Sequence, residues 1–172
     1  MASAPQAWMG LVTAEWKTAL SDAGFRKRGH LFRRQYEDAV WVIQAQSSSS
    51  SSALGLKMTI NLGVHVPALY DVLAYDDRPR PAWPTPSECQ FRERLGPLMP
   101  EHTDLWWTVA TDQAATALGR ELAQLLIRYG LPALESVGTS ARLRTYWESG
   151  RSSGITKVLA ERYLAALGRS AQ

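Results

Sequence analysis

The chain has 172 residues, of which 45% are hydrophobic and 20% charged, and its formal net charge is +3. A chain of this size can bury a core without metal or disulfide staples. Its single cysteine, Cys89, excludes an internal disulfide, and the lack of a Cys/His cluster argues against structural zinc. Glu15 and Lys17 interrupt the apolar N-terminal stretch, so we expect neither a signal peptide nor a membrane span there. We therefore expect a cytoplasmic protein with no metal and no cofactor.

The first half of the chain predicts one helix followed by three strands. Apolar residues recur at three- and four-residue intervals over residues 6–23, and Gly24 is placed to end that helix. The segments "HLFRRQY" and "AVWVIQAQ", joined at Glu37 and Asp38, predict a β-hairpin. The clean alternation of "LKMTINLGVHV" predicts the third strand. The serines at 47–52 predict a mobile hairpin loop, not a domain linker, because the strands on both sides continue one apolar face.

The second half predicts a long loop, two short strands and several helices. Residues 67–88 contain five of the chain's 9 prolines, which predicts a helical turn followed by an irregular loop. The segments "CQFRERL" and "DLWWTVA" predict short strands. Asp112 is placed as the N-cap of a long helix that Gly130 ends. Glycine-separated segments after residue 131 predict two or three shorter helices.

These elements predict an α+β fold, in which an antiparallel sheet of about five strands carries helices packed mainly on one face. We expect one domain over residues 1–172, with a sheet-and-helix core at about 7–135 and C-terminal helices at about 136–169. The sequence contains no internal repeat that would indicate a second core.

The order of several motifs resembles one family of proteins. The motifs are a first helix ending in "AGF", then "LFRRQ", "VIQAQS", "MTINLGV", "CQFRERLG", "DLWWTV" and "YGLPALES". Through these motifs, the chain resembles the domain of unknown function 4304 (DUF4304) family. The resemblance covers about Trp8 to Leu134. The family name assigns no activity. The resemblance implies an immunity or interaction role, because some proteins of this kind sit beside toxin or secretion genes.

Strand alternation also predicts a polar face of the sheet, which would carry the candidate site. If residues 41, 43 and 45 share the core face with residues 58 and 60, the alternate side chains point to the opposite face. We expect that face to carry Arg33, Gln44, Gln46, Thr59, Asn61, His65, Arg92 and Arg94. Arginine binds carboxylates or phosphates through two hydrogen bonds, and amides both donate and accept. Such a face can bind a small anion, a peptide terminus or a nucleotide, whereas the simpler interpretation is a solvated face of the sheet.

Three functions are compatible with these residues. The first is non-enzymatic binding of an immunity-like kind, through the polar face or the proline-rich loop from Asp71 to Glu88. The second is a small-molecule or nucleotide-handling enzyme centred on His65, Arg92 and Arg94, with its catalytic residues unknown. The third and weakest is nucleic-acid binding through Arg26–Arg34. We favour the first, with a protein partner or a small anionic ligand, no nucleic acid and no membrane.

The tryptophans support an interaction role. The chain contains 7 Trp, and tryptophan and arginine are the residues most enriched at interface hot spots. Of the adjacent Trp106 and Trp107, one must face the core and the other the polar face, and the sequence does not decide which. We expect Cys89 to be a buried, inert thiol, with a nucleophile activated by His65 or His102 as the alternative.

Overall fold

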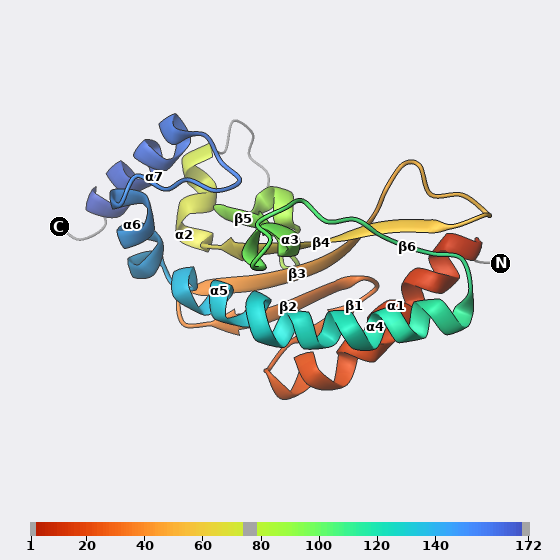
Figure 1. Cartoon of the computed structure of the whole chain (residues 1–172). Coiled ribbons are helices and arrows are strands. Elements are labelled where there is room, and N and C mark those ends of the chain that lie inside the picture. The colour runs from red at the N-terminus through yellow and green to blue at the C-terminus, as the bar shows by residue number, and fades with distance from the viewer. Residues whose placement is uncertain (1–2, 74–78, 170–172) are drawn as a thin grey trace.

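A six-stranded antiparallel sheet forms the centre of the molecule. The computed structural model describes residues 3–73 and 79–169. The strands are β1 (Arg26–Arg28), β2 (Leu31–Tyr36), β3 (Ala39–Ser47), β4 (Leu56–His65), β5 (Phe91–Arg94) and β6 (Trp107–Val109). The first five pair in chain order, and β6 pairs with the start of β4 on the same edge as β5 (Figure 1). The α+β class and the antiparallel sheet are thus confirmed, with β1 as a strand that the sequence did not predict.

The helices cover one face of the sheet and one of its ends. They are α1 (Ala4–Asp22), α2 (Pro67–Tyr70), η1 (Asp71–Leu73), η2 (Pro86–Glu88), α3 (Leu95–Leu98), α4 (Asp112–Leu125), the π-helical η3 (Leu126–Gly130), α5 (Leu131–Val137), α6 (Ser140–Glu148) and α7 (Lys157–Arg169). The long helices α1 and α4 run side by side under the sheet, while α2, α6 and α7 gather at its far end (Figure 1). Within the described ranges, no helix combines the length and the apolar character needed to cross a bilayer.

The ends of α4 differ from the prediction. Thr111, and not Asp112, is the N-cap: its backbone is extended and its hydroxyl accepts a hydrogen bond from the Ala114 amide at 3.1 Å. Gly130 does not end the helix, because η3 runs through it into α5. A Cβ at Gly130 would lie 3.2 Å from Leu126 and 3.6 Å from Leu62, so this glycine allows close packing on the sheet.

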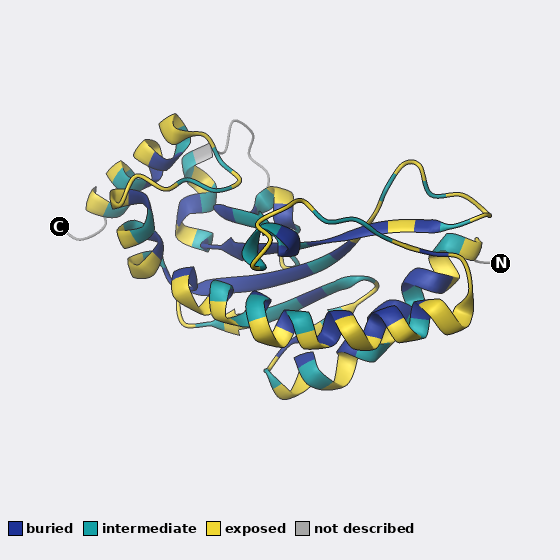
Figure 2. Cartoon of the chain, viewed as in Figure 1, coloured by how far each residue is buried: buried dark blue, intermediate teal, exposed yellow. Residues whose placement is uncertain are grey.

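The pairing of β3 with β4 determines which of their side chains face the core. Ile43 lies opposite Leu62, so the odd positions of β3 and the even positions of β4 share the face covered by α1, α4 and α5, as the alternation predicts. Figure 2 shows β3 and β4 buried along most of their length. The same hydrophobic cluster extends from Trp8 in α1 to Tyr163 in α7, so the C-terminal helices pack on the core that the sheet begins.

Both predicted hairpins are present. Glu37 and Asp38 form the two-residue turn between β2 and β3, with Glu37 at a φ of 50°. The serine tract lies in the loop that joins β3 to β4. There the Ser51 hydroxyl accepts from the Lys57 amide at 2.9 Å and donates to the Lys57 carbonyl at 3.0 Å. Serine side chains therefore supply hydrogen bonds where the strand ladder ends, and the mobility of this loop stays a prediction.

The face of the sheet opposite the core, here called the outer face, is covered at one end by residues 84–90. Cys89 packs there on Val40 and Val42. Its sulfur lies so close to β4 that a Cβ at Gly63 would be 2.6 Å away from it. The Gln90 amide and side chain both bond to the end of β4, through the Val64 carbonyl and the Val66 amide. This covering segment leaves only the other part of the outer face open.

Replacing Gly63 with alanine tests this contact. The new Cβ would lie 2.6 Å from Cys89 Sγ and 3.0 Å from Cys89 Cβ, so the covering segment must shift. We expect the free energy of unfolding, measured by urea denaturation, to fall by about 1–3 kcal/mol. Cys89→Ala in the same chain should recover part of that loss, and purely additive effects of the two substitutions would contradict the contact. Gly10→Ala, where nothing lies within 4 Å, is the control and should not destabilise.

Candidate functional site

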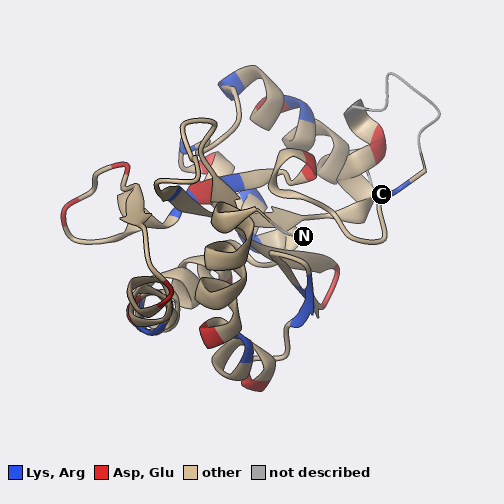
Figure 3. Cartoon of the chain, turned by 90° about the vertical axis from the view of Figure 1, so that its right-hand side faces the viewer, with Lys and Arg blue, Asp and Glu red and all other residues tan. Residues whose placement is uncertain are grey.

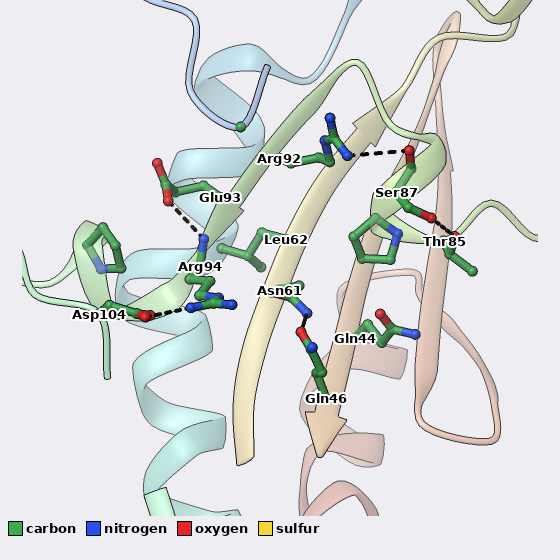
Figure 4. Close-up of a pocket in the computed structure, with 13 residues that line it drawn as sticks. Gln44, Gln46, Asn61, Leu62, Thr85, Ser87, Arg92, Glu93, Arg94 and Asp104 are labelled. Carbon is green, nitrogen blue, oxygen red and sulfur yellow. Dashed lines mark hydrogen bonds and ion pairs between the residues drawn. The ribbon is translucent and has the colours of Figure 1, made fainter. Parts of the chain in front are cut away.

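A pocket of about 770 Å³ lies on the open part of the outer face (Figure 4). Its volume falls in the range of ligand-binding pockets. Strands β3, β4 and β5 form its floor, and η2 forms one wall. The lining residues are Gln44, Gln46, Asn61, Leu62, Thr85, Pro86, Ser87, Arg92, Glu93, Arg94, Pro97, Asp104 and Gly154.

Five of the eight predicted site residues line this pocket. They are Gln44, Gln46, Asn61, Arg92 and Arg94. The strand register brings them together, because Asn61 lies opposite Gln44 on one side and opposite Arg94 on the other. The Asn61 amide donates to Gln46 Oε1 at 2.6 Å, which ties the floor of the pocket across β3 and β4 (Figure 4).

The other three predicted residues lie elsewhere. Thr59 and His65 are on the outer side of β4 but are buried, at 0% and 1% exposure, so the expectation of an exposed polar face is corrected for both. The Thr59 hydroxyl donates to the Leu105 carbonyl at 2.9 Å, under the segment that leads into β6. Arg33 lies beyond the covering segment, with its guanidinium 5.8 Å from the Trp83 ring. Alternation predicts the side of a strand correctly but not which loops cross it.

His65 and Cys89 belong to the covered end of the outer face. His65 Nδ1 lies 2.8 Å from the Glu88 carbonyl, an arrangement in which a neutral ring donates its Nδ1 hydrogen. Burial lowers the pKa of His65 and raises the pKa of the Cys89 thiol. Four positions separate Asn61 from His65 along β4, about 13 Å. His65, Arg92 and Arg94 therefore do not converge in one pocket.

Arg94 is paired within the chain. Its guanidinium forms an ion pair with Asp104 and lies 5.0 Å from the Trp106 ring, whose Nε1 donates to the same carboxylate at 3.3 Å. Lys57 lies over that ring from β4, at 5.7 Å. Trp106 is thus on the outer face, and Trp107 packs against the core. This settles the alternative that the "WW" pair leaves open.

Arg92 lacks such a counter-charge. Its Nη1 donates to the Ser87 carbonyl at the long distance of 3.5 Å, and its buried Nε has no hydrogen-bond partner. Among the described residues, no carboxylate forms an ion pair with it. Gly154, at a φ of 73°, packs closely on its main chain, because an added Cβ would come 2.2 Å from the Arg92 carbonyl oxygen. The main chain at Arg92 is therefore closely packed, while its guanidinium still has hydrogen-bond donors without an acceptor.

The pocket also contains residues that the sequence reasoning did not select. Thr85 and Ser87 come from the proline-rich loop, of which residues 74–78 lie outside the described residues. The spacing of Thr85 and Glu88 in "TPSE" is a capping-box signal that could have located η2, and the Thr85 amide does donate to Glu88 Oε2 at 2.8 Å. No local signal reveals that Asp104, ten residues after Arg94, pairs with it.

The basic stretch Arg26–Arg34 is used in part for packing. Phe25 and Phe32 are core residues, and the Arg34 guanidinium lies 4.7 Å from the buried Trp41 ring. Figure 3 shows cationic and anionic residues interspersed over the elements in view. Within residues 3–73 and 79–169, no three His, Cys, Asp or Glu side chains gather as metal ligands would.

The chain matches the model of a protein family. The family model described as "Domain of unknown function (DUF4304)" matches residues 16–136. This range contains all six strands and nearly all of the pocket lining. No curated protein and no solved structure matches the chain.

The buried His65 and the half-buried His30 predict how stability depends on pH. Burial lowers the pKa of His65 and of His30, so between pH 7.5 and 5.5 the unfolded chain takes up protons that the folded chain does not. The free energy of unfolding should keep its full value above about pH 6.5. Below that pH it should fall by at most about 1.4 kcal/mol per pH unit for each histidine. Urea denaturation across this range measures the slope.

Substitutions assign that slope to residues. His65→Gln should flatten the pH dependence, whatever its effect on stability at pH 7.5, because one group with a lowered pKa is removed. His102→Asn, which removes a histidine at an exposed position, is measured alongside as the matched control. Equal slopes in wild type and His65→Gln would contradict the assignment.

Proposed function

Since the chain belongs to the DUF4304 family, whose description assigns no activity, we propose its function from the outer-face pocket: it is a non-enzymatic, cytoplasmic protein-binding domain of the immunity or interaction type. A partner protein docks on the open part of the outer face and inserts an acidic group into the pocket. The proposal unites the two surfaces that the sequence suggested, because η2 of the proline-rich loop forms a wall of the pocket on the polar face.

The state of Arg92 is the observation that carries this proposal. A half-buried guanidinium is costly to desolvate unless acceptors surround it. Among the residues that the structure describes, its guanidinium donates only to the Ser87 carbonyl, at 3.5 Å, which is near the limit of a hydrogen bond. A carboxylate from outside the chain would complete its hydrogen bonds and supply the missing charge. The cost is thus offset when a partner is bound.

The composition of the pocket favours binding over catalysis. The residues best suited to be nucleophile and base, Cys89 and His65, are buried under or within the covering segment and do not line the pocket. The pKa of the Cys89 thiol is raised by burial, which opposes formation of the reactive thiolate. The other polar lining groups are arginines, amides, hydroxyls and the carboxylates of Glu93 and Asp104, and both carboxylates already bond within the chain.

The rim of the pocket has the character of a binding surface. Trp106 and Arg94 are both partly exposed there, and Lys57 lies over the same ring. Tryptophan and arginine side chains with this partial exposure are typical anchors at protein interfaces. A partner that covers this rim would exclude water from the Arg92 contact and strengthen it.

Capture from lysate with matched variants tests the proposal. The immobilised wild-type chain should retain a specific partner protein from cells that naturally make it. Arg92→Gln should weaken retention by roughly tenfold or more, the loss expected for one charge-assisted hydrogen-bonded contact. Arg128→Gln removes the same charge from an exposed position on the helical face and should retain the partner as wild type does. A partner bound equally by all three chains, or no partner at all, would overturn the proposal.

A further inference from the structure

The pocket contains two arginines placed to receive two acidic groups. Arg92 and Arg94 are two positions apart on β5 and lie in register with Gly63 and Asn61 of β4. Side chains at positions i and i+2 of a strand point to the same face, about 6.5–7 Å apart. An extended peptide has the same spacing, so two acidic side chains separated by one residue match the two guanidinium groups.

One of these two positions is already filled from within the chain. The Asp104 carboxylate pairs with Arg94 and accepts from Trp106 Nε1. It lies on the irregular segment between α3 and β6, and its side chain is 49% exposed. Because ion pairs at this exposure are weak, an incoming carboxylate can replace Asp104 at little cost. The pairing with Asp104 thereby shows that Arg94 is placed to bind a carboxylate.

The floor of the pocket suits the main chain of such a peptide. Within the described part of the chain the Gln44 side-chain amide has no hydrogen-bond partner, and that of Asn61 is bonded to Gln46. These groups both donate and accept, as peptide amides do, and they carry no charge that would repel an acid. The other lining acid, Glu93, already accepts from the Ser153 hydroxyl and from the Arg94 amide.

We propose that the outer-face pocket binds an extended acidic segment of the partner, with two Asp or Glu residues separated by one residue, and that Asp104 occupies the place of one of them in the free protein. The first carboxylate binds Arg92, and the second displaces Asp104 from Arg94. The inference rests on the proposed protein-binding function and adds the chemistry of the bound segment.

Two labelled pentapeptides of equal composition test the spacing. Fluorescence anisotropy compares Gly-Glu-Ser-Glu-Gly with Gly-Glu-Glu-Ser-Gly, which carries its carboxylates on opposite sides when extended. The spaced peptide should bind roughly fivefold tighter, as one additional exposed ion pair allows. Equal affinity of the two peptides, or complete displacement of the spaced peptide by free glutamate at the peptide's own concentration, would overturn the inference.

Variants of the chain test the place of Asp104. Asp104→Asn should raise the affinity for the spaced peptide roughly threefold, because its internal competitor is removed. Glu121→Gln, which removes the same charge from an exposed position of α4, should leave the affinity nearly unchanged. Arg92→Gln should reduce binding of both peptides. An Asp104→Asn chain that stays folded by circular dichroism and binds no tighter than wild type would contradict the proposal.

The two proposals fail in different ways. A partner that is captured from lysate in an Arg92-dependent manner, together with equal binding of the two peptides, overturns the acidic-pair inference and leaves the protein-binding function standing. Discrimination between the peptides with no partner captured overturns the proposed function and leaves the acidic chemistry of the pocket supported.

Discussion

The pairing of β3 with β4 is the constraint on which the rest of the structure depends. With Ile43 opposite Leu62, the odd positions of β3 and the even positions of β4 face α1, α4 and α5, while Val40 and Val42 face Cys89 on the other side. A slip of one residue would turn those side chains outward and bring Gln44 and Asn61 into the core. The large apolar area buried by this pairing therefore also fixes the polar floor of the pocket on the other side.

The covering segment then divides the outer face into two regions of different character. Where Cys89 packs over Gly63, neighbouring polar groups such as His65 are buried and satisfied by the main chain. Beyond η2 the face stays open, and there the amides, Arg92 and Arg94 meet solvent. The local dielectric therefore differs along β4. The strand carries the buried His65 at one end and the accessible side-chain amide of Asn61 four residues away.

The periodicity of apolar residues in the sequence was enough to predict most of the fold and about half of the site. The helix at α1, the two hairpins and the sides of β3 and β4 follow from spacings within one element, which local sequence determines. The burial of Thr59 and His65 depends on segments 46 and 23 residues away that cross the sheet, as their bonds to Leu105 and Glu88 show. Such crossings leave no periodic signal. Asp104 was missed for the same reason, since its pairing with Arg94 depends on where an irregular segment returns.

The shared edge of β4 has a consequence for how this family can diversify. Because β5 and β6 pair end to end with one strand, the chain leaves the sheet after Arg94 and returns at Trp107, with no ladder to maintain in between. Loops of this kind accept insertions and deletions at small cost in stability. A change in length there moves Asp104 relative to Arg94 while the core stays intact. Under the proposed binding function, such changes would alter selectivity among relatives without changing the scaffold.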